Sequence, residues 1–79
     1  MSENTSCIDH KAIGRRIAYY RKNFAGVGMS QSKLADRAGL TRHTIRNYEN
    51  GRGMSVDSAT RIACALEIRL VDLLEGGSA

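Results

Sequence analysis

The 79-residue sequence has no long apolar run and only two cysteines, and these absences exclude several classes of protein. No apolar stretch approaches the ~18–20 residues of a membrane span, and the first residues lack a signal-peptide pattern. We therefore expect neither membrane insertion nor secretion. Cys7 and Cys64 are too few and too far apart for a disulfide scaffold, so we expect a reduced, cytoplasmic protein.

Patterns typical of β-strands, metal sites and catalysis are also lacking. No useful length of alternating Val, Ile or Thr occurs, so a sheet is not expected. Cys7 and His10 have a ligand-like spacing, but a metal site needs three or four ligands, and His43 and Cys64 are placed elsewhere. No Ser/His/Asp arrangement and no phosphate-binding loop are present. We expect no cofactor and no enzymatic activity.

The charge of the chain is unevenly distributed. The net charge is +4, with an isoelectric point near 9.5. Residues 9–53 hold ten basic and three acidic side chains, whereas residues 54–79 hold two basic and four acidic ones. A basic front of this kind favours binding of a polyanion. A charge excess that serves only solubility is the alternative, because surface Lys and Arg are common.

Five segments space their apolar residues as amphipathic helices do. The predicted helices cover residues 9–24, 31–38, 42–50, 56–66 and 70–74. Side chains that favour the N-cap position mark the first four starts, at Asp9, Ser30, Thr41 and Ser55. Gly39 and Gly51 end the second and third helices, because glycine suits the positive φ of a C′ position. The pattern predicts one all-α domain over residues 9–75, with flexible tails at residues 1–8 and 76–79.

The last third of the chain carries more apolar side chains than a small core needs. Within residues 56–66 the spacing predicts burial of Val56, Ala59, Ile62, Ala63 and Leu66. Cys64 is expected near that buried side, as a small hydrophobe. Because small domains gain most from association, we predict a homodimer interface formed by Ile68, Leu70, Val71 and Leu74. The alternative is that these side chains only complete the core of a monomer.

Residues 31–50 combine the features that two steeply crossing helices require. Ala35 is small enough for a close approach of two backbones, and Gly39 follows four residues later at the turn. Leu40 is placed to fill the turn, and Ile45 and Tyr48 anchor the next helix. Each match alone is weak, but together they indicate a helix-turn-helix.

The segment 42–50 separates its polar and apolar side chains. At ~100° per residue, one arc holds Arg42, His43, Arg46 and Asn47, and the opposite arc holds Thr44, Ile45 and Tyr48. Arginine pairs with guanine and asparagine with adenine in a major groove, and the polar arc has no acidic residue. We predict that this arc reads base edges. The alternative is a solvated face, although such faces more often mix Glu and Lys.

From Ile13 to Leu74 the chain resembles the phage repressor and Cro type of helix-turn-helix domain, the XRE family. The matching segments are IGRRIAYYR, MSQSKLADRAGLTRHTIRNYENG and SVDSATRIACALEI..VDLL. The resemblance implies a five-helix, lambda-repressor-like fold with double-stranded DNA as its partner. It further implies a transcriptional regulator, most often a repressor or autoregulator, that binds a palindromic operator as a dimer.

The resemblance also implies roles for individual residues. Base reading is assigned to Thr41, Arg42, His43, Arg46 and Asn47, of which Arg46 would contact either a phosphate or a further base. Phosphate binding is assigned to Gln31, Lys33, Asn50 and Arg52. Arg21 and Glu49 correspond to a structural ion pair that ties the first helix to the third.

Four departures from the family pattern are visible. The connection NFAGVGM is longer than the family's usual turn, Met54 replaces a common proline, and Arg69 replaces the usual Ser or Thr cap of the last helix. Lys33 replaces the usual acid in the first turn of the second helix, which matches the helix dipole less well but favours a nearby phosphate. Two other functions are the alternatives. An antitoxin-like protein would bind a toxin and repress its own promoter, but both tails are short and unpatterned. A small nucleic-acid enzyme would need clustered acids, which the basic face lacks.

Overall fold

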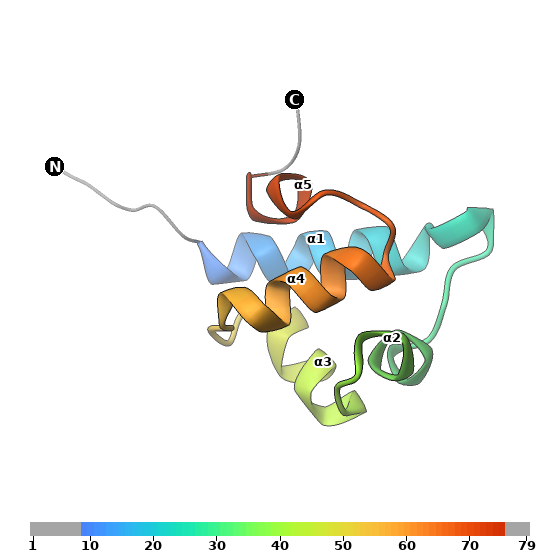
Figure 1. Ribbon diagram of the computed structural model, residues 1–79, viewed down its shortest axis with the longest axis horizontal. Helices are drawn as coiled ribbons and strands as arrows, with labels where there is room; N and C mark the ends of the chain where they lie inside the picture. The colour runs from blue at the N-terminus through green and yellow to red at the C-terminus, as the bar shows by residue number, and fades with distance from the viewer. Residues whose placement is uncertain (1–8, 76–79) are drawn as a thin grey trace, which may run out of the picture.

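The computed structural model describes residues 9–75 and contains five α-helices and one short 3₁₀ helix there (Figure 1). The α-helices are α1 (His10–Lys22), α2 (Gln31–Ala38), α3 (Arg42–Glu49), α4 (Val56–Ala65) and α5 (Leu70–Glu75); the 3₁₀ helix is η1 (Phe24–Gly26). No strand occurs in the described range. The predicted all-α, five-helix fold is confirmed. The tails predicted at residues 1–8 and 76–79 lie outside the described residues.

Short-range capping explains where the first four α-helices begin. Asp9 accepts hydrogen bonds from the backbone N–H groups of Lys11 and Ala12, both at 3.1 Å. Ser30, Thr41 and Ser55 each accept one from the backbone three residues further on. These bonds satisfy N–H groups that no helical carbonyl can reach. Gly39 ends α2 with a φ of 72°, as a left-handed C-cap position favours.

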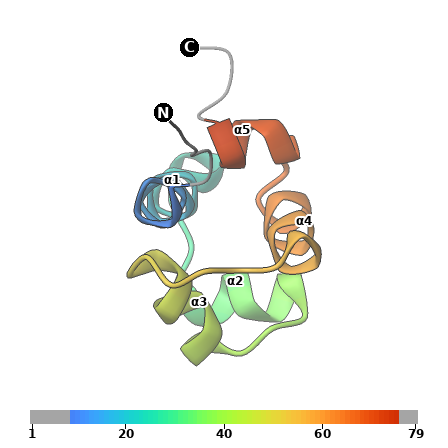
Figure 2. The same cartoon turned by 90° about the vertical axis from the view of Figure 1, so that its left-hand side faces the viewer.

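The helices pack in three levels around one core. Figures 1 and 2 show α5 above α1 and α4, with α2 and α3 below them. Each of the five α-helices contributes buried apolar side chains, the largest being Ile13, Ile17, Leu34, Ile45, Ile62 and Leu73. This arrangement leaves the outer side of the α2–α3 pair facing solvent, on the opposite side of the molecule from α5.

Two predictions of burial in α4 are wrong. Val56 is 70% exposed, because it is the first residue of α4 and lies before the part of the helix that the other elements cover. Cys64 is exposed as well. One residue turns the helix by ~100°, which carries Cys64 from the buried Ala63 to the solvent side. The stripe from Ala59 to Leu66 is otherwise buried as expected.

The long connection between α1 and α2 is closed at its base by Arg21 and Met29. The Met29 N–H donates to the Arg21 carbonyl at 2.9 Å, and the Arg21 guanidinium donates to the Met29 carbonyl at 3.0 Å. Between them the backbone takes positive φ at Ala25 (53°) and at Gly28 (80°). A Cβ on Gly28 would lie 2.6 Å from the Lys22 carbonyl. The extra residues therefore form a loop whose two ends are hydrogen-bonded to each other, and Arg21 fixes where α2 begins.

Candidate nucleic-acid interface

The exposed side of α3 carries hydrogen-bond donors that no described residue engages. Arg42, His43 and Arg46 are exposed and Asn47 is half-buried. Within residues 9–75 these four side chains take part in no hydrogen bond and no ion pair. Two guanidiniums, an imidazole and a carboxamide are thus available on one face for a ligand that accepts hydrogen bonds.

The opposite side of α3 is held firmly in the domain. Ile45 is completely buried, and the Tyr48 hydroxyl donates to the Ser58 hydroxyl of α4 at 3.2 Å. Thr41 holds the start of the helix, since its Oγ1 accepts from the Thr44 N–H at 3.1 Å and lies 2.8 Å from the Thr44 hydroxyl. The Thr41 side chain therefore has a structural task beside the base-reading one predicted for it.

A partly buried ion pair fixes α3 relative to α1. The Arg21 Nε donates to Glu49 Oε2 at 2.6 Å and its Nη2 donates to Oε1 at 3.0 Å. The two side chains are only 12% and 9% exposed. Gln31 at the start of α2 also donates to Glu49 Oε1, at 3.1 Å. Since Arg21 bonds the Met29 carbonyl too, one network joins α1, the α1–α2 connection, α2 and α3.

Gly14 permits the close contact between α1 and the end of α3. A Cβ at this position would lie 2.8 Å from the Glu49 carbonyl oxygen and nearer still to that of Tyr48. Only a glycine allows the two backbones to approach this closely. The role of Gly14 was not predicted from the sequence, although a glycine inside a helical pattern often indicates a packing constraint.

Further basic and polar groups lie beside α3. Lys33, Asn50 and Arg52 are exposed and Gln31 is half-buried. Neither α2 nor α3 has an acidic side chain in its first turn, so the positive ends of both helix dipoles are uncompensated from within their own helices. Such helix starts favour an anion. The surface therefore combines the fixed dipoles of two helix starts with exposed cationic side chains.

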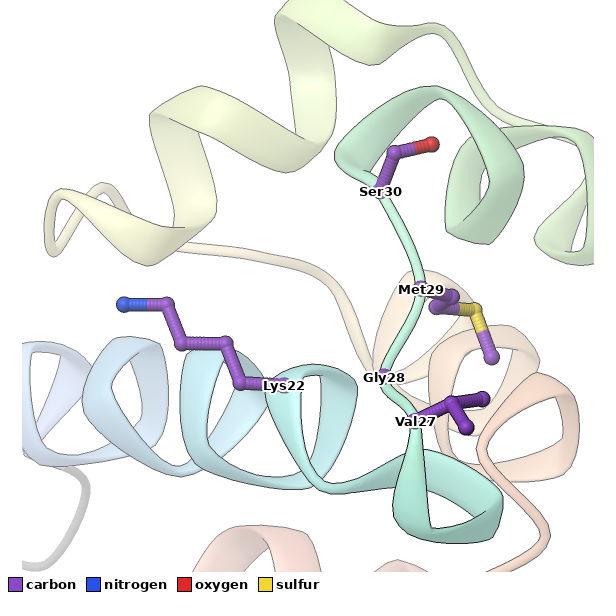
Figure 3. A pocket seen from close by; sticks show the side chains of 5 residues that line it. All are labelled: Lys22, Val27, Gly28, Met29 and Ser30. Carbon is purple, nitrogen blue, oxygen red and sulfur yellow. The ribbon is translucent and has the colours of Figure 1, made fainter.

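The longer connection adds an open hollow at the edge of this surface. The hollow has a volume of about 310 Å³ and is lined by Lys22, Val27, Gly28, Met29 and Ser30. Figure 3 shows Lys22 on α1 and Ser30 at the start of α2, with Val27, Gly28 and Met29 on the connection between them. Lys22 forms no ion pair within the described range.

Other site types find no support in residues 9–75. No three His, Cys, Asp or Glu side chains in this range converge to hold a metal ion. None of the helices described here combines the length and apolar character needed to cross a bilayer.

A helix-turn-helix family model matches residues 17–73, which include α2, the turn and α3. The chain belongs to this helix-turn-helix family. The resemblance to the phage repressor and Cro type is thereby confirmed, and α2 with α3 forms the helix-turn-helix unit. No match was found among the curated proteins.

Solved structures agree with this assignment. The restriction-modification controller protein C.AhdI from Aeromonas hydrophila is 30% identical, with a TM-score of 0.74 over 82% of this chain and 96% of that one. The biofilm regulator SinR, solved in complex with DNA, is 28% identical, with a TM-score of 0.68 over 77% and 95% of the two chains. The P22 c2 repressor, solved with a synthetic operator, is 23% identical at a TM-score of 0.72 over 81% and 94%, which shows the shared fold. The helix-turn-helix unit thus stands in a lambda-repressor-like domain.

Proposed function

We propose that this protein is a transcriptional regulator that binds a palindromic DNA operator as a homodimer and acts as a repressor or autoregulator. The observation that carries the proposal is the two-sided character of α3. Its inner side is fixed by Ile45, Tyr48 and Glu49. Its outer side presents unengaged donors and no acid. A rigid helix with free donors suits the major groove of DNA, which admits one α-helix.

Base reading and positioning fall to different residues. Arg42 and Arg46 would make bidentate bonds to guanine and Asn47 to adenine, with His43 and Thr41 beside them. The phosphate-binding residues are Gln31, Lys33, Asn50 and Arg52. Their contacts would set the position of α3 along the groove without reading sequence. Membership of the helix-turn-helix family and the likeness to SinR bound to DNA support this division.

The apolar surface at the other end of the molecule supports the proposal of a dimer. Val71 is 41% exposed, and Ile68, Leu70 and Leu74 are only partly buried against the core. Pairing these side chains across a twofold axis would remove them from water. Two copies of α3 would then enter successive major grooves about 34–36 Å apart. A bound dimer acts by excluding other proteins from the operator, and its occupancy follows protein concentration.

Two matched substitutions test the proposal. Asn47→Ala should weaken binding to the best operator by about 1–3 kcal/mol and relax the preference at one base position. Lys33→Ala should weaken binding to the operator and to random duplex alike. It should also reduce the slope of log affinity against log salt concentration by about one, because one phosphate contact is lost. Both are measured by fluorescence anisotropy on the two duplexes at one salt concentration. Equal losses on both duplexes for Asn47→Ala would refute base reading by α3.

A further inference from the structure

The last helix, α5, is too short to be stable by itself. It spans six residues, Leu70–Glu75, and isolated helices need about twelve or more to be even marginal in water. Leu73 is its one fully buried side chain. At its start the Asp72 carboxylate accepts the Arg69 N–H at 3.1 Å and binds the Arg69 guanidinium at 3.0 Å. The orientation of α5 therefore depends on what holds its other end.

Arg16 of α1 holds that other end. Its Nη1 donates to the Leu74 carbonyl at 2.8 Å and to the Leu73 carbonyl at 3.1 Å, in a partly buried position. The last carbonyls of a helix have no partner within the helix, and a cation there is favoured by the helix dipole. Arg16 thus satisfies two carbonyls of α5 with one charged group that is anchored in α1.

The same helix also fixes α3. Gly14 brings α1 against the last carbonyls of α3, and Arg21 binds Glu49. Arg16 lies between these two positions in sequence, and its side chain points to α5 instead. One continuous helix therefore connects the helix that would read DNA with the helix that carries the apolar surface.

We propose that Arg16 is a positioning residue for dimerisation, and that it sets the distance between the two copies of α3. By holding the Leu73 and Leu74 carbonyls, it orients α5 so that Leu70, Val71 and Leu74 meet the same surface of a second copy. Because α1 is rigidly joined to α3, that orientation also fixes the half-site spacing the dimer accepts. This inference rests on the dimeric regulator proposed above.

The first test measures self-association of the full chain without DNA. Sedimentation equilibrium is run on the natural protein, Arg16→Met and Arg16→Lys, with Arg15→Met as the control at the neighbouring exposed position. Methionine keeps an unbranched apolar stem but has no hydrogen-bond donor. Circular dichroism verifies the helical content and cooperative unfolding of each variant. Arg16→Met should raise the dimer dissociation constant about tenfold or more, since it loses two charge-assisted bonds. The dissociation constant of Arg16→Lys should lie between those of Arg16→Met and the natural protein, and that of Arg15→Met should equal that of the natural protein.

A dimer dissociation constant for folded Arg16→Met within twofold of the natural protein would overturn the inference. If Arg16→Met does not fold, Arg16→Lys decides. We then expect a loss of threefold or more, and an unchanged constant would overturn the inference. A natural protein that stays monomeric at all concentrations would overturn it as well. The DNA-reading part of the proposed function would then be judged separately, by sequence selection with the monomer.

The second test uses a readout that loss of stability alone does not change. Operators are made with the two half-sites at the preferred spacing and with one base pair more or less, and the ratio of affinities is measured. The natural protein and Arg15→Met should discriminate sharply between spacings. Arg16→Met should lower the ratio, because a loosely held α5 lets the two α3 helices vary in separation. An unchanged ratio in Arg16→Met would contradict the link between α5 orientation and spacing.

Discussion

Replacing Gly14 with alanine tests whether close packing of α1 on the end of α3 determines the stability of the domain. In an exposed helix interior this change stabilises by up to about 1 kcal/mol, because alanine loses less backbone entropy. Here the new Cβ would lie 2.8 Å from the Glu49 carbonyl and closer to that of Tyr48, whereas ordinary contact begins at 3.4 Å. Both obstructing atoms belong to the backbone, so no side-chain rotation relieves the contact.

The two helices have to separate, and the cost can be estimated. Inserting a methyl group into a packed interior costs about 1–3 kcal/mol, and a backbone obstacle places Gly14→Ala in the upper part of that range. The gain in helix propensity offsets up to about 1 kcal/mol. We therefore expect a net loss of about 1–2 kcal/mol. In a domain of this size that lowers the unfolding temperature by about 5–15 °C.

Thermal unfolding followed by circular dichroism measures the effect. Arg15→Ala is the matched control, since it creates the same residue at the next position of α1, where the side chain is exposed. The control should stay within about 0.5 kcal/mol of the natural protein. A Gly14→Ala variant as stable as the natural protein, or more stable, would refute the argument from the α1–α3 contact.

Three further predictions concern other parts of the domain. Ala25→Gly should stabilise the domain by up to about 1 kcal/mol, because the left-handed φ of 53° at Ala25 costs about 1–2 kcal/mol, which exceeds the entropy cost of glycine. An unfolding temperature that does not rise would contradict this prediction. Arg21→Met and Glu49→Gln should each destabilise by about 1–3 kcal/mol, because each leaves a partly buried partner with fewer charge-assisted bonds. A double-mutant cycle should show strong coupling, whereas additive losses would mean that the two groups act independently. The Arg69 guanidinium, hydrogen-bonded to Asp72, lowers the pKa of the Asp72 carboxyl. The contribution of the Asp72 carboxylate to stability is therefore present above about pH 4 and lost as the pH falls through its folded-state pKa. Asp72→Asn should make the unfolding temperature fall less steeply on the acid side, and an unchanged pH dependence would exclude this contribution.

Features of the fold that depend on neighbours in sequence could be predicted from the sequence. The caps at Asp9, Ser30, Thr41 and Ser55 form within three residues of themselves. The glycine that ends α2 is equally local. The polar arc of α3 was predictable too, because helical periodicity alone places its four side chains on one side.

Features that depend on distant partners were not predictable. The carbonyls that Arg16 binds lie 57 and 58 residues further along the chain. The exposure of Val56 and Cys64 depends on which part of α4 the other helices cover. The loop between α1 and α2 is closed by the hydrogen bonds between Arg21 and Met29. A sequence pattern does not indicate that the two ends of an insertion lie next to each other.

Specific DNA reading by α3 is the central claim, and it is tested most directly by selecting bound sequences from a random duplex pool. The salt concentration is held fixed, because affinity for DNA depends steeply on it. The account predicts an enriched palindrome with half-sites about 10 base pairs apart. Binding without enrichment, which merely fades as salt rises, would contradict it and would show that the basic surface binds DNA without reading sequence.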